Sequence, residues 1–189
     1  MTEMNETAAT LPNEMSLLAT AKTEPAAFSA IYEHYFPRVY TYIRYRIRNA
    51  PTADDIAAAV FERVLARLGD YRPESGPFAG WLYAIARNTV SDYQRTERRR
   101  RGFLTGLLFD KPSHEPAQDD AMILGERRFA LMAAIARLSD RERDVLALRF
   151  SAGLGNKAIA KLTGMRESNV AVIVFRALGR LRADLSSTR

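Results

Sequence analysis

Apolar residues recur at every third or fourth position through most of this chain, which is the spacing of amphipathic α-helices. The clearest sets lie in the first half of the sequence. They are Phe28, Ile31, Tyr35, Val39 and Tyr42; Ile56, Val60, Val64 and Leu68; and Phe78, Trp81, Leu82, Tyr83 and Ile85. Strand-like alternation is essentially absent, so the predicted fold class is all-α.

The first half of the chain predicts one small helical bundle over residues 14–101. Its helices are expected over 14–22, 24–49, 54–68 and 78–101. Thr52 is expected to cap the third of these helices, because its hydroxyl can accept a hydrogen bond from a free N–H group of the first turn. The polar segment 1–13 is expected to be disordered.

A change of composition separates this bundle from a second one. Residues 102–125 are rich in glycine, proline and acidic side chains, and we expect a flexible linker with an apolar patch at 103–109. Residues 126–187 form the second predicted bundle, in which Ser139 and Glu142 make a capping box. A short helix, a turn at Gly164 and a long helix then follow, and this order indicates a helix-turn-helix.

The predicted helix over 78–101 changes character along its length. Its first half is aromatic and apolar, whereas its end is basic, with five arginines between positions 95 and 101. Helical spacing puts Asn88, Ser91, Arg95 and Arg98 on one face. Aromatic rings stack on bases and arginines neutralise phosphates, so this helix can bind nucleic acid. On these residues alone, an amphipathic core helix with a solvated charged end explains the pattern equally well.

Composition reduces the number of function classes that fit this chain. The net charge is +6 and the isoelectric point about 9.8, which favours nucleic acid or an anionic membrane surface as partner. The absence of cysteine excludes thiol nucleophiles, disulfides and cysteine zinc sites, and it fits a reducing cytoplasm. The two histidines, His34 and His114, lie far apart. We therefore expect no enzyme activity, no metal and no cofactor. No apolar run is long enough to cross a bilayer, so we expect a cytoplasmic protein without membrane insertion.

Taken in order, four segments resemble the extracytoplasmic-function group of bacterial RNA polymerase sigma factors. They are AAFSAIYEHYFPRVYTYIR, ADDIAAAVFERVLARL, GPFAGWLYAIARNTVSDYQR and ARLSDRERDVLALRFSAGLGNKAIAKLTGM. The resemblance implies a sigma two domain over 14–101 and a sigma four helix-turn-helix domain over 126–187. It also implies that the chain binds core RNA polymerase and promoter DNA, and that an anti-sigma factor restrains it.

The resemblance also assigns roles in the first domain. Tyr71 and Phe78 would stack on flipped bases of the −10 element, and Asn88 would bond a base edge. The strand upstream would meet Arg87, Ser91, Arg95 and Arg98. Trp81 fits the core better than a base platform. Core polymerase would bind Asp54, Asp55, Glu62 and Arg63, although Ala58 and Ala59 stand where the family usually carries a Gln-Glu pair.

The expected recognition helix departs further from the family. Ala171, Val172 and Ile173 occupy positions that are usually polar or basic. Small apolar side chains can contact thymine methyls but cannot form a bidentate bond with guanine. Reading of the −35 element would then rest on the helix start, with phosphate contacts nearby. The residues concerned are Arg166, Glu167, Ser168 and Asn169, with Lys157 and Arg176 for phosphates. Alternatively, the run from Val170 to Phe175 packs against protein.

Two other functions stay open at this point. A free-standing helix-turn-helix regulator would explain the second bundle but needs no polymerase. A protein-interaction adaptor would explain the apolar recognition helix but leaves the arginines at 95–101 without a purpose.

Overall fold

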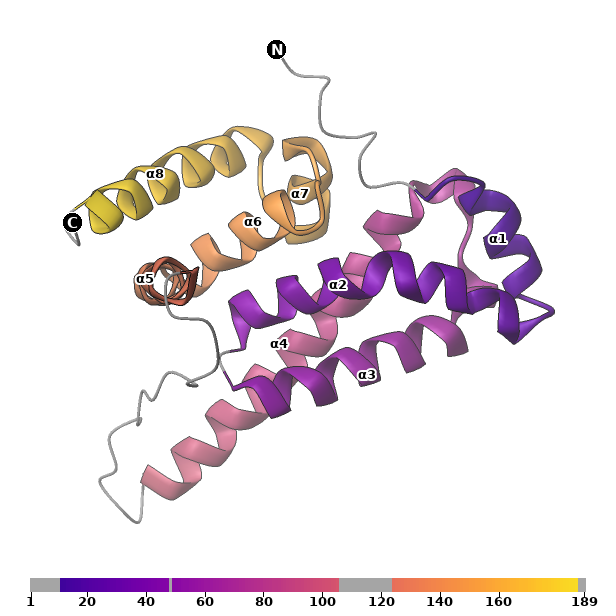
Figure 1. Cartoon of the computed structure of the whole chain (residues 1–189), viewed down its shortest axis with the longest axis horizontal. Helices are drawn as coiled ribbons and strands as arrows, with labels where there is room; N and C mark the ends of the chain where they lie inside the picture. Colours follow the sequence, from indigo (N-terminus) through magenta and orange to yellow (C-terminus); the bar gives the residue numbers. More distant parts are fainter. Residues whose placement is uncertain (1–10, 48, 106–123, 187–189) are drawn as a thin grey trace.

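The computed structural model describes residues 11–47, 49–105 and 124–186, and every regular element in those ranges is helical (Figure 1). The first domain contains α1 (Glu14–Ala21), α2 (Phe28–Arg46), α3 (Ala50–Ala66) and α4 (Phe78–Thr105). The second contains α5 (Leu124–Arg137), α6 (Asp140–Phe150), α7 (Asn156–Thr163) and α8 (Glu167–Ser186). The all-α prediction is confirmed. No helix in the described ranges combines the length and apolarity that crossing a bilayer needs.

The helix boundaries follow from local capping chemistry. Ser139 and Glu142 form the predicted capping box at the start of α6: the Glu142 N–H donates to Ser139 Oγ over 3.3 Å, and the Ser139 N–H donates to Glu142 Oε2 over 3.0 Å. The predicted cap of α3 is wrong. Asn49 caps this helix by accepting a 2.9 Å bond from the Thr52 N–H, and Pro51 fits the first turn because its missing N–H is not needed there.

The turn of the helix-turn-helix depends on one glycine. Gly164 ends α7 with φ at +71°, in the left-handed region that a residue with a Cβ atom enters at a cost. The chain can then reverse and begin α8 at Glu167.

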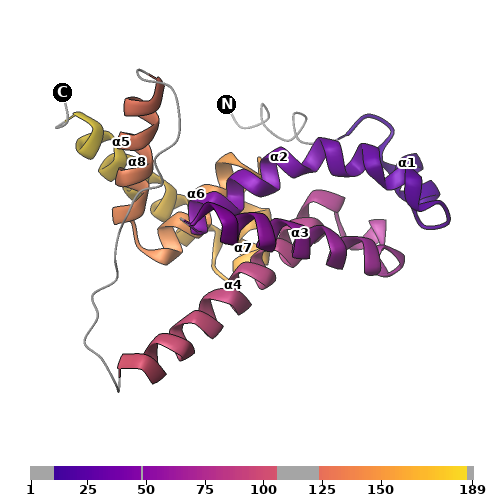
Figure 2. The same cartoon turned by 60° about the horizontal axis from the view of Figure 1, so that its bottom comes forward.

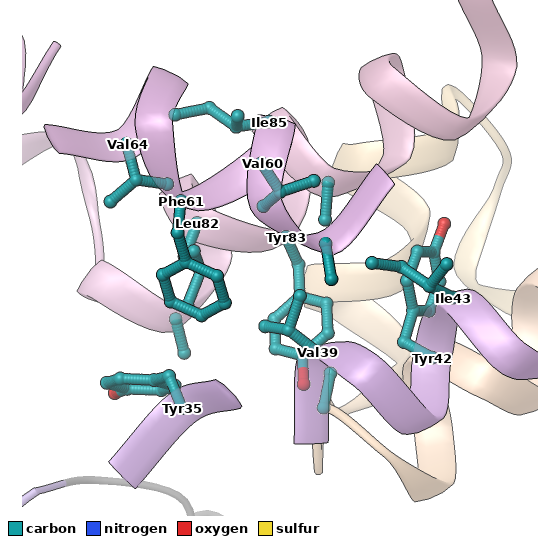
Figure 3. Close-up of a cluster of buried hydrophobic side chains, with 14 of the residues drawn as sticks. Tyr35, Val39, Tyr42, Ile43, Val60, Phe61, Val64, Leu82, Tyr83 and Ile85 are labelled. Carbon is teal, nitrogen blue, oxygen red and sulfur yellow. The ribbon is translucent and has the colours of Figure 1, made fainter. Parts of the chain in front are cut away.

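The core of the first domain lies where α2, α3 and α4 meet. Figure 3 shows side chains from all three helices converging, including Ile43, Val60 and Leu82, which are fully buried. The rings of Tyr42 and Tyr83 meet edge to face at 5.6 Å between centroids. Leu11, within the segment expected to be disordered, packs partly buried on this core, whereas residues 1–10 lie outside the described ranges.

The two domains pack against each other. Helix α6 lies along α2, and Val145, Ala147 and Leu148 belong to the same hydrophobic core as the first domain (Figures 1 and 2). Helix α4 runs to Thr105 and α5 begins at Leu124, so most of the predicted linker over 102–125 lies outside the described residues. The sequence predicts two bundles but contains no signal for this interface.

We expect Ile43→Ala to destabilise the first domain by roughly 3 kcal/mol, because it leaves a cavity among three helices. Leu65→Ala on the exposed side of α3 is the control and should change stability by less than about 0.5 kcal/mol. Urea unfolding followed by circular dichroism measures both. Equal midpoints for the two variants would contradict this placement of the core.

Candidate functional site

One face of α4 carries the polar residues that the sequence grouped together. Asn88, Ser91, Arg95 and Arg98 are all exposed. The Arg95 guanidinium lies 2.8 Å from Asp92 on the same helix, an exposed pair that water screens and that contributes little stability. Arg98 likewise pairs with Asp140 of the second domain at 2.8 Å, and both of these side chains are exposed. An external ligand therefore meets Asn88 and Ser91 directly and competes with weak, exposed ion pairs for Arg95 and Arg98. We call this face the α4 track.

A concavity of about 570 Å³ opens beside the α4 track. Its lining is Arg46, Ser91, Gln94, Arg95, Arg98, Arg99 and Asp140. Four guanidinium groups and one carboxylate make this hollow electropositive, and planar guanidinium groups match the geometry of phosphate oxygens. The hollow can therefore accommodate an anionic group such as a phosphate.

Arg87 is predicted to touch DNA, but its guanidinium is already engaged. Its Nε donates to Asp144 Oδ2 at 2.9 Å, and its Nη1 donates to the Leu162 carbonyl at 3.2 Å. Both acceptors belong to the second domain. In this conformation Arg87 cannot reach a phosphate.

Tyr71 and Phe78 are predicted to stack on bases, and the structure does not place them to do so. Tyr71 is 3% exposed and Phe78 is 0% exposed. Their rings meet edge to face at 5.4 Å, and Trp81 lies 5.6 Å from each. Tyr71 Oη donates to the Gly76 carbonyl over 3.0 Å. The rings therefore pack beneath the 69–77 loop and support it. Burying so large an aromatic surface is more favourable than leaving it in water. Trp81 is half-buried against the core, as expected.

The residues assigned to polymerase binding lie along α3. Asp54, Asp55 and Glu62 are exposed, and a hydrogen bond with Asp54 raises the pKa of the Tyr40 hydroxyl. Arg63 behaves differently. Its Nη1 donates to Thr89 Oγ1 over 3.0 Å and ties α3 to α4. Arg63 thus has a structural partner within the domain.

The helix-turn-helix presents a mixed surface. Lys157, Arg166 and Arg176 are exposed, as are Glu167, Ser168 and Asn169 at the start of α8. Val170 is fully buried, but Val172 is 46% exposed and Phe175 is 80% exposed. Both exposed apolar side chains share a face with Ser168, at steps of four and three. The apolar run is therefore not buried on all sides within this chain.

Glu142 ties α6 to α8 in the second domain. Partial burial disfavours its charged form, but hydrogen bonds from Ser139 and the Arg180 charge hold its pKa below the usual value. Arg180 Nη1 lies 3.0 Å from the carboxylate. Arg180 on α8 is therefore occupied within the fold.

Sequence reasoning missed the residues at the centre of the molecule. Asp144 is 7% exposed, and both Tyr42 and Arg46 bond it from α2. Nothing in the sequence distinguishes Asp144 from a solvated carboxylate, since its partners lie far away in the chain. Among the described residues, no group of histidine, aspartate and glutamate side chains could hold a metal ion.

Comparisons with known proteins match both domains. Residues 31–100 match the model of Sigma-70 region 2, and residues 128–181 match that of Sigma-70 region 4. The ECF RNA polymerase sigma factor ShbA of Streptomyces griseus is 32% identical over 163 residues, which cover 79% of this chain and 83% of ShbA. The ECF RNA polymerase sigma factor BldN of Streptomyces coelicolor is 33% identical over 174 residues, or 90% of this chain and 66% of BldN.

Solved structures with low sequence identity share the fold. The sigma factor RpoE, from a co-crystal with the anti-sigma factor NepR of Bartonella quintana, is 20% identical with a TM-score of 0.67. The match covers 86% of this chain and 98% of that one. CnrH, in complex with the cytosolic domain of CnrY, is also 20% identical, with a TM-score of 0.65 over 92% of this chain and 97% of that one.

Because the Tyr71 ring is buried, we expect Tyr71→Ala to lower the free energy of unfolding by roughly 3–5 kcal/mol. The matched change on the exposed α4 track, Asn88→Ala, should alter it by less than about 0.5 kcal/mol. Thermal unfolding separates the two. A Tyr71→Ala variant as stable as the parent would mean that the ring is free to serve as a stacking platform.

Proposed function

Because this chain belongs to the extracytoplasmic-function group of RNA polymerase sigma factors and directs promoter-specific transcription initiation, we propose that its surfaces divide that task. The α4 track contacts the −10 element, the start of α8 contacts the −35 element, and the exposed face of α3 binds core polymerase. The observation that carries this proposal is the ordered pair of regional matches, each falling on one of the two helical domains. A free-standing helix-turn-helix regulator would not need a domain that matches Sigma-70 region 2.

At the −10 element we assign the base contact to Asn88 and the strand contacts to Ser91, Arg95 and Arg98. An amide side chain offers both a donor and an acceptor to a base edge. Unstacking a base costs a few kcal/mol, which new contacts must offset. The buried rings of Tyr71 and Phe78 act indirectly, by holding the loop in front of this helix.

At the −35 element the second domain has two kinds of contact to offer. Arg166, Ser168 and Asn169 lie exposed where recognition helices meet base edges. Val172 and Phe175 extend that surface with apolar groups suited to thymine methyls. Lys157 and Arg176 flank it as phosphate contacts, whereas Arg180 is paired with Glu142.

The remaining partners follow from the family. The exposed carboxylates of α3 suit a docking surface on core polymerase, and Arg63 supports that face through α4. The structural neighbours RpoE and CnrH were each solved with a protein partner, the anti-sigma factor NepR and the cytosolic domain of CnrY. We propose that this chain also has an anti-sigma factor, that it acts by binding and not by catalysis, and that it works in the cytoplasm beside the polymerase.

We expect Asn88→Ala to reduce promoter opening about tenfold, the effect of losing one hydrogen bond of roughly 1.4 kcal/mol, while affinity for core polymerase stays unchanged. Thr41→Ala, an exposed polar change on α2, is the control and should open promoters normally. Fluorescence of a base analogue placed in the −10 element, with purified core polymerase, measures opening. No stimulation of core polymerase by the unmodified protein would contradict the whole proposal.

We expect the double variant Asp55→Ala/Glu62→Ala to weaken binding to core polymerase roughly tenfold, because these side chains lie seven residues apart on one exposed face. Glu24→Ala/Glu33→Ala removes the same charge from exposed sites elsewhere in the domain. Fluorescence anisotropy with labelled protein and core polymerase compares them. Equal affinity of both variants would remove α3 from the polymerase interface.

A further inference from the structure

The strongest unassigned feature is the polar contact between the two domains. Asp144 on α6 is buried, and its Oδ1 accepts a 2.9 Å bond from Tyr42 Oη as well as a bond from Arg46. Its Oδ2 accepts a 2.9 Å bond from Arg87 Nε. Every one of these donors comes from the first domain, so the protein supplies these bonds only while the domains are packed together.

A second carboxylate of the same helix lies four residues earlier, one turn away. Asp140 Oδ2 accepts a 2.8 Å bond from Arg98 on α4. Arg87 and Arg98 are eleven residues apart, which is three turns, so both start from the same side of α4. Two carboxylates of the second domain thus engage Arg98 of the α4 track and Arg87, which the family resemblance also assigns to promoter DNA.

This pairing uses the chemistry that a phosphate would use. Guanidinium groups bind carboxylate and phosphate oxygens through the same charge-assisted N–H···O bonds. We propose that Asp140 and Asp144 form a carboxylate latch that occupies the phosphate-binding arginines of α4, so that the closed chain and the DNA-bound chain exclude each other. The inference rests on the proposed function, because it takes the α4 track as a DNA-binding surface.

The latch leaves the other proposed surface uncovered. Asp54, Asp55 and Glu62 on α3 are exposed in the same closed conformation. Core polymerase can therefore dock before the domains part, whereas DNA cannot gain Arg87 until they do. The Arg98–Asp140 pair is exposed on both sides, so a phosphate can displace it while the chain is still closed. The arginine-lined hollow leaves Arg95 and Arg99 reachable, so a phosphate can bind there first and compete for Arg98.

Removing the latch charges should open the chain. The double variant Asp140→Asn/Asp144→Asn would leave the buried Arg46 and the partly buried Arg87 without a counter-charge unless the domains separate into water. Glu24→Gln/Glu33→Gln is the matched control, with the same change in net charge at exposed sites of the first domain. Because the chain has no cysteine, single cysteines at Thr41 and Ser186 allow dyes to be placed on the two domains for energy transfer.

We expect the latch variant to show lower energy transfer than the parent and the control. The probe is a short mixed-sequence DNA duplex, since phosphate contacts do not depend on sequence. Its affinity for the latch variant should exceed that for the control roughly tenfold, the worth of one or two charge-assisted bonds. Two more phosphate contacts should also steepen the slope of log K against log salt by about 2. Unchanged transfer, or a duplex affinity equal to the control's, overturns the inference.

A measurement on the unmodified chain keeps the test independent of how the variants fold. Energy transfer should fall as the duplex is titrated at low salt, and transfer that stays high at saturation overturns the inference. Transcription with core polymerase on the same preparations distinguishes failure of the proposed function from failure of the latch. Loss of stimulation by the unmodified protein contradicts the proposed function, whereas normal stimulation with unchanged transfer contradicts only the latch.

Discussion

The closed arrangement of this chain depends on one buried carboxylate. Asp144 has been taken out of water, which costs several kcal/mol for an ion unless its oxygens are bonded. Tyr42 and Arg46 from α2 and Arg87 from α4 supply those bonds. Burial and the Asp144 charge raise the pKa of Tyr42 well above its usual value, so the hydroxyl stays protonated and donates. The bonds to this one carboxylate therefore fix how α2, α4 and α6 lie relative to one another.

Apolar packing and this polar contact have different consequences. Val145, Ala147 and Leu148 bury surface against the first domain, and such contacts tolerate small shifts. The bonds to Asp144 do not, because a hydrogen bond weakens steeply as its geometry degrades. The apolar contacts thus stabilise the interface, and the bonds to Asp144 set the relative orientation of the two domains.

Much of the fold could be predicted from the sequence because its determinants are local. The apolar stripes of α2 and α3, the capping box of Ser139 and the turn at Gly164 each depend on a few neighbouring residues. The functional site was harder to predict from the sequence. Tyr71 and Phe78 have the chemistry of stacking residues, but only the three-dimensional core shows that their rings are buried. Asp144 bonds groups 57 to 102 residues away, and no local pattern encodes such a partnership.

Helix α4 is a single rod of 28 residues, about 42 Å long. Its first turns belong to the ring cluster of Tyr71, Phe78 and Trp81, and its basic half extends beyond the body of the first domain (Figure 2). It contains no proline, the residue that most often kinks a helix sharply. One continuous backbone therefore joins the exposed Arg98 to the rings that pack behind the 69–77 loop. The arginines at one end and the loop-bracing rings at the other are therefore fixed in register, and neither can shift along the helix axis without the other.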